Sequence, residues 1–181
     1  IHIWEQPIVK NYDGLNLGLV PWICKENEDE CYDFIQTAKA PILLGHLELG
    51  GFQYMANANI KSHGIGTEIF QRYEAVYSGH YHTKSTRDNV TYLGTQFELT
   101  WSDAGDPKYF HVLNTETRDI EPVANTNVLF QKLVYDNENE PFITKDNIEG
   151  TYIKVIVNNK KDLFAFDQFM DKLYNMNPYE V

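Results

Sequence analysis

Histidines stand directly after two short apolar stretches of this chain, in each case behind a glycine. His46 follows Ile-Leu-Leu-Gly at 42–45, and His80 follows Val-Tyr-Ser-Gly at 76–79, with His82 two residues further on. Buried strands that end in this way would carry imidazoles to the carboxyl edge of a sheet, where open α/β folds bind their ligands. Imidazole suits Zn²⁺, Mn²⁺ and related divalent ions.

A single histidine of this kind is more often a structural residue than a metal ligand. Three of the six histidines share this placement, however, and two of them form Gly-His-x-His. Histidines two positions apart can point to the same side of an extended or turning backbone. The combination therefore favours a metal centre, whereas His2 and His111 carry no such signal.

The elements that would position these histidines can be read from hydrophobic periodicity and turn residues. The short apolar stretches predict strands buried between helical layers, and the mixture of helical and hairpin connections predicts a mixed sheet. Residues 47–66 are rich in glycine and asparagine and indicate a long functional loop. The expected strands are 1–9, 15–20, 41–46, 74–79, 89–94, 97–101, 108–114, 119–123 and 151–157; the expected helices are 27–39, 68–73 with Thr67 as N-cap, and 162–174.

Charge and composition exclude several classes of protein. The net charge is −11, and the acidic residues are spread evenly with no basic stripe, which disfavours simple electrostatic binding to a phosphate backbone. No run approaches the roughly 20 apolar residues of a membrane helix. The spacing of Cys24 and Cys31 matches no zinc knuckle or redox pair, so we expect two reduced thiols in a cytoplasmic protein.

A family resemblance becomes specific at the histidine motifs. Gly-His-Leu-Glu at 45–48 and Gly-His-Tyr-His at 79–82 resemble two ligand motifs of the calcineurin-like metallophosphoesterases, and within them the DNA-repair nucleases of the SbcD type. The likeness extends through 19–27, 60–64 and 105–117. It implies an α/β fold: residues 1–124 as the C-terminal half of a four-layer αββα sandwich with mixed sheets, and residues 125–181 as the start of a small α+β capping, DNA-recognition domain.

The resemblance also implies a site. His46, His80 and His82 would be ligands of two divalent metal ions, usually Mn²⁺, in a nuclease that hydrolyses phosphodiesters. His63 would lie near the scissile phosphate, although an exposed loop histidine is the simpler interpretation. Glu48 could orient an imidazole, and Thr95 resembles a position near the site.

Three further ligand motifs of the family are absent from the sequence: Asp-x-His, Gly-Asp-x-x-Asp and Gly-Asn-His-Asp. Because the chain also opens on Ile1 in an apolar stretch, we expect a fragment that begins inside a fold and is inactive alone.

The partners that the resemblance implies are DNA, an ATPase subunit of the SbcC type and, at full length, a second copy of the chain. No membrane partner is expected. The expected location is the cytoplasm, which for a phage protein is the cytoplasm of the host cell.

Other functions remain open. The chain could be a non-catalytic module that binds DNA or the ATPase, or a metallophosphoesterase that acts on a small phosphate ester. Two classes are excluded: His-Leu-Glu at 46–48 lacks the Pro-Cys-x-x-Cys of zinc deaminases, and no His-Glu-x-x-His of a zincin occurs.

Overall fold

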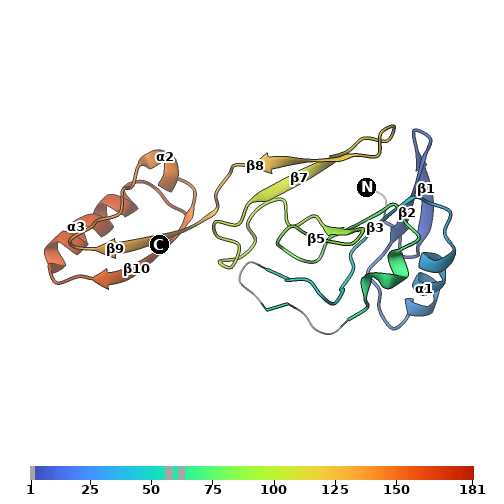
Figure 1. Cartoon of the computed structure of the whole chain (residues 1–181). Helices are drawn as coiled ribbons and strands as arrows, with labels where there is room; N and C mark the ends of the chain where they lie inside the picture. Colours follow the sequence, from blue (N-terminus) through green and yellow to red (C-terminus); the bar gives the residue numbers. More distant parts are fainter. Residues whose placement is uncertain (1–2, 56–58, 61–63) are drawn as a thin grey trace. The chain divides into compact units, whose positions relative to one another are not determined.

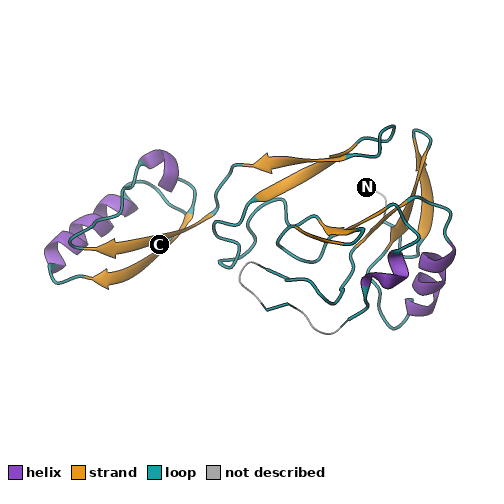
Figure 2. Ribbon diagram, in the orientation of Figure 1, coloured by secondary structure: helices purple, strands orange, loops and turns teal. Residues whose placement is uncertain are grey.

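The chain folds into two compact units in the computed structural model, which describes residues 3–55, 59–60 and 64–181 (Figure 1). The first unit comprises residues 1–96 and 107–125, and the second comprises 97–106 and 126–181. The expected α/β class is confirmed, with several sheets and few helices (Figure 2).

A mixed six-stranded sheet forms the centre of the first unit. Its spatial order is β1-β2-β3-β4-β6-β5. Strands β2, β3, β4 and β6 run parallel to their neighbours in this series, while β1 and β5 pair antiparallel at the two edges. The strands are β1 (Ile8–Tyr12), β2 (Leu15–Val20), β3 (Ile42–Gly45), β4 (Ala75–Ser78), β5 (Ser85–Arg87) and β6 (Val90–Tyr92).

Alternating residues of these strands build two apolar clusters, as expected for a sheet covered on both faces. One face packs against α1 (Glu28–Thr37) and the 3-10 helix η1 (Thr67–Phe70). The other face packs against the antiparallel pair β7 (Lys108–Leu113) and β8 (Ile120–Asn125) through Leu113 and Ile120. The four central strands are therefore positioned by packing on both sides.

Helix α1 forms because its sequence suits a helix on a sheet. Three acidic residues occupy its first turn, where they complement the helix dipole. Cys31 and Ile35 lie one turn apart and are fully buried against the sheet. Cys24, before the helix, is partly exposed, and neither cysteine forms a disulfide. Burial raises the pKa of the Cys31 thiol.

The second unit is a small α+β structure. Its parallel strands β9 (Phe130–Asp136) and β10 (Tyr152–Asn159) carry α3 (Leu163–Tyr174) on one face, with the short helix α2 (Lys145–Ile148) beside them. The buried carboxylate of Glu98 accepts hydrogen bonds from the backbone N–H groups of Leu129 and Phe130, at 2.7 and 2.8 Å. Segment 97–106 thus belongs with the second unit, although residues 107–125 of the first unit separate the two in sequence.

Three expectations about elements were wrong. The first strand spans Ile8–Tyr12 and not residues 1–9, and Ile3 is 84% exposed, so the apolar start of the chain has no sheet to pack on. Residues 97–101 form an irregular loop and not a strand, because the Asp103 carboxylate accepts the N–H groups of Leu99 and Thr100. Thr67 is the first residue of η1, and Gly66 is its N-cap.

Among the residues that the structure describes, no helix is long and apolar enough to cross a membrane. The assignment of residues 1–124 and 125–181 to a nuclease part and a cap stays a prediction.

We predict that His111 makes the first unit less stable in mild acid. Its Nε2 is buried without a hydrogen-bond partner in the described structure, and burial together with nearby Lys84 lowers its pKa from the ordinary 6.5. The unfolded chain therefore binds the proton more tightly, so stability falls as pH drops below about 6.5 toward the lowered native value. Urea unfolding at pH 7.5 and 5.5 measures how much free energy of unfolding is lost on acidification. The loss should be smaller in His111→Gln than in the unchanged chain, and an equal loss would contradict the prediction.

Candidate functional site

The carboxyl ends of β3 and β4 bring two of the predicted histidines together. Gly45 and Ser78 are partners in the parallel register of these strands, and Gly79 N–H donates to the Gly45 carbonyl at 3.0 Å. His46 and His80 therefore leave the sheet at the same edge. Their ring centroids lie 5.3 Å apart, with the ring planes at 77°.

Glycine at position 79 is required by this close approach. A Cβ there would lie 2.8 Å from His46 Nδ1, closer than real side chains come. The next residue, His80, has a φ of +86°, a conformation that costs free energy for any residue other than glycine. Backbone strain of this kind gathers at functional sites, where the surrounding structure holds it in place.

Trp22 completes a cluster of three rings. Its indole centroid lies 5.6 Å from that of His46 and 5.1 Å from that of His80. Desolvation by these neighbours lowers the pKa of His46. A lowered pKa keeps the imidazole neutral at pH 7, and the neutral form is the one that binds a metal ion.

His82 is fixed through its backbone. Its N–H donates to the Tyr54 carbonyl at 2.8 Å, and its own carbonyl accepts from Thr95 N–H at 3.1 Å and from Lys108 Nζ at 3.0 Å. Lys108 is buried at 3% exposure and belongs to β7. The hairpin β7–β8 therefore helps to hold the segment that follows β4.

The histidine pair does not by itself make a complete metal site. Across residues 3–55, 59–60 and 64–181, no three His, Cys, Asp or Glu side chains are placed to hold one metal ion. The structure brings the rings of His46 and His80 together, while the assignment of His46, His80 and His82 as metal ligands stays a prediction. His63 lies outside the described residues, and Glu48 is an exposed residue of the loop after β3.

Sequence reasoning missed the tyrosines that hold this edge of the sheet. The Tyr92 hydroxyl donates to the Leu47 carbonyl at 2.8 Å and accepts from Leu49 N–H at 3.0 Å, and the Tyr81 hydroxyl donates to the Leu49 carbonyl at 2.8 Å. Ser78 Oγ accepts the N–H of Leu47 at 2.8 Å. Tyr81 lies inside Gly-His-Tyr-His, a motif that sequence analysis singled out for its histidines and not for this tyrosine.

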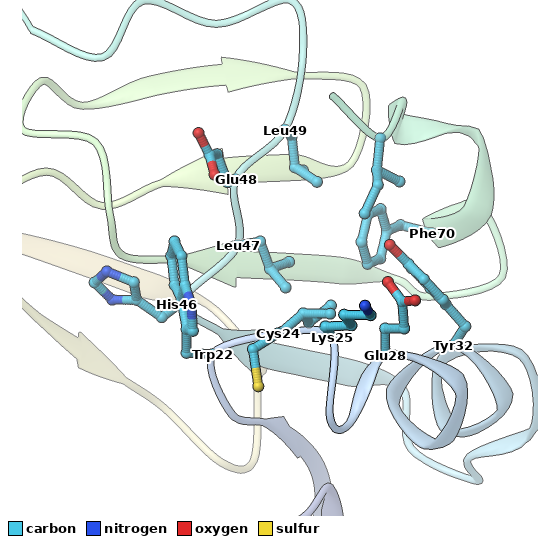
Figure 3. A pocket seen from close by; sticks show the side chains of 12 residues that line it. Trp22, Cys24, Lys25, Glu28, Tyr32, His46, Leu47, Glu48, Leu49 and Phe70 are labelled. Carbon is cyan, nitrogen blue, oxygen red and sulfur yellow. The ribbon is translucent and has the colours of Figure 1, made fainter. Parts of the chain in front are cut away.

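A cavity of about 240 Å³ opens beside His46 (Figure 3). Trp22 stands between the His46 imidazole and Leu47 at one end of this space. The cavity walls are both apolar and polar, and the lining residues come from the segment before α1, from α1 itself, from the loop after β3 and from η1.

Comparison with known proteins gives one clear likeness. The chain is 32% identical over 174 residues to exonuclease subunit 1 of Enterobacteria phage T4, and this match covers 96% of the chain. The chain spans about half the length of that relative. No protein-family profile matches the chain.

We predict that Tyr92→Phe loosens the loop that carries His46. The substitution leaves a buried N–H and a buried carbonyl without partners, which should cost about 1–3 kcal/mol of unfolding free energy. Tyr73→Phe is the matched control, since the buried Tyr73 hydroxyl donates to the Ile35 carbonyl away from the histidines. Both variants should lower the urea midpoint, but only Tyr92→Phe should shift the His46 imidazole resonances in NMR spectra. Equal shifts from both variants would refute this role.

A second prediction concerns the strained backbone at position 80. Glycine adopts a positive φ without a Cβ penalty, so the free energy of unfolding of His80→Gly should exceed that of His80→Ala by about 1 kcal/mol or more. In a urea titration His80→Gly should therefore unfold at the higher urea concentration. Elsewhere in regular structure the order is reversed, with alanine the more stabilising of the two. Alanine equal to or better than glycine here would show that the position is not strained.

Proposed function

We propose that this chain is part of a metal-dependent phosphodiesterase. The observation that carries the proposal is the paired imidazoles of His46 and His80, presented by adjacent parallel strands at one edge of the sheet. Imidazoles suit divalent ions, and a bound ion supplies a hydroxide at neutral pH and stabilises charge on phosphate oxygens. His46 and His80, and His82 if its side chain turns toward them, would hold such an ion, with Mn²⁺ the expected one.

Within that class we propose a DNA nuclease of the SbcD type. Support comes from the likeness to a protein whose name describes it as an exonuclease subunit, and from the motifs at 45–48 and 79–82. The six-stranded sheet, with helices on one face and β7–β8 on the other, is compatible with part of a four-layer αββα sandwich. Residues 125–181 would then begin a DNA-recognition cap.

The proposed partners are DNA, an SbcC-type ATPase and, in a longer chain, a second copy. The word "subunit" in the relative's name describes a protein that works in a complex. Because this chain is strongly acidic, bound metal or the partner ATPase would have to supply attraction for DNA. The host cytoplasm is the proposed location.

A non-catalytic binding module is the second candidate, and one observation favours it. The described residues hold no group of three metal ligands, and the sequence lacks the acidic motifs that bridge two ions in the family. Such a module would bind DNA or the ATPase equally well after all three histidines were replaced. Action on a small phosphate ester is a weaker alternative that model esters would reveal.

We predict that the chain alone binds Mn²⁺ weakly and does not hydrolyse DNA. Calorimetric titration should detect Mn²⁺ binding that His46→Ala and His80→Ala each weaken, while His111→Ala, the matched control at a histidine outside the predicted ligand set, should leave it unchanged. Incubation of the 181-residue chain with Mn²⁺ and linear or single-stranded DNA should give no more product than the His80→Ala variant. Turnover above that background would refute the predicted inactivity, and binding unaffected by either histidine substitution would refute the metal site.

A further inference from the structure

The cavity beside His46 has no role in the arrangement described so far. It extends from the indole of Trp22 toward the first turn of α1 (Figure 3). Its apolar walls are Trp22, Ile23, Leu47, Leu49, Ile65 and Phe70. Its polar groups at the far end are Lys25, Glu28 and the Tyr32 hydroxyl. A volume of about 240 Å³ is below that of sites for drug-sized ligands and suits one or two rings.

Hydrogen bonds fix the backbone that carries Trp22 at the mouth of this cavity. The Asn27 side chain donates to the Trp22 carbonyl at 3.0 Å and accepts from Cys24 N–H at 2.8 Å, and Asn27 N–H donates to the Cys24 carbonyl at 3.1 Å. The turn between β2 and α1 is therefore fixed by three hydrogen bonds. Trp22 nevertheless remains 46% exposed, so solvent reaches part of the residue.

The two ends of the cavity match the two kinds of contact that a nucleobase makes. An aromatic face at the mouth can stack on the ring, and Lys25 and Glu28 at the far end offer a hydrogen-bond donor and an acceptor to its polar edge. Proteins that bind single strands stack bases on aromatic side chains in this way. Because the stacking needs no cationic surface, it also suits a chain of net charge −11.

We propose that this cavity binds the base of the nucleotide whose phosphate lies at His46 and His80, with Trp22 as the stacking surface. The proposal rests on the proposed function, because a substrate whose phosphate lies at His46 and His80 has a base within reach of the cavity only if that substrate is a nucleotide or a nucleic acid. It adds a substrate-binding residue, Trp22, that lies 5.1 Å from His80 and 5.6 Å from His46, ring to ring.

The test uses a double variant, Trp4→Phe with Trp101→Phe, in which Trp22 is the only tryptophan. The fluorescence of Trp22 is measured in the presence of EDTA while ligand is added. Thymidine 5′-monophosphate should quench the signal saturably, and 2-deoxyribose 5-phosphate, which has the same phosphate and sugar but no base, should bind at least about fivefold more weakly. In the chain that keeps the other tryptophans, Trp22→Leu should abolish the difference between the two ligands. Trp4→Leu, the matched control at another exposed tryptophan, should leave it unchanged.

Equal affinity for the two ligands, or no quenching at millimolar thymidine 5′-monophosphate, would overturn the proposal. The result does not depend on the metal, because EDTA is present throughout. If the base preference is observed and Mn²⁺ binding is not, the proposed nuclease function fails while the base site stands. If Mn²⁺ binds and no base preference is seen, only the base site fails.

Discussion

The Tyr92 hydroxyl satisfies two backbone groups that the loop after β3 would otherwise bury without partners. It donates to the Leu47 carbonyl and accepts from Leu49 N–H, and both leucines lie in the apolar core of the first unit. Unpaired peptide groups in such surroundings are costly, so the favoured loop conformation is the one in which both groups bond to the Tyr92 hydroxyl. That conformation fixes the direction in which His46 leaves β3, and Gly79 then allows the end of β4 to approach it.

Elements with strong local signals could be predicted from the sequence, and elements stabilised by distant contacts could not. The apolar stretches of β3 and β4 and the amphipathic pattern of α1 stood where they were expected. Strand β9 was missed because Phe130–Asp136 lies in a polar region and pairs in parallel with β10, across a helix and a turn. Its backbone is also positioned by Glu98, more than thirty residues earlier, and no local pattern reveals such a contact.

The site was predictable to the extent that a motif implies an edge of a sheet. The sequence predicted that His46, His80 and His82 converge. His46 and His80 do lie together, because neighbouring parallel strands end side by side, while the position of the His82 ring stays a prediction. The positive φ of His80 was not predictable, since histidine rarely adopts it and only the packing around the site makes it tolerable. The positions of Trp22 and Lys108 likewise depend on how separate segments meet, which spacing in the sequence does not report.

The two cysteines differ in exposure, so their labelling rates can report local unfolding of α1. Alkylating reagents attack thiolates that solvent can reach, so Cys24 on the cavity wall can react in the native state. Cys31 is wholly buried on the face of α1 that packs on the sheet, and burial raises the pKa of its thiol, so it reacts only in molecules whose helix has left the sheet. The ratio of the two labelling rates therefore measures how often α1 detaches.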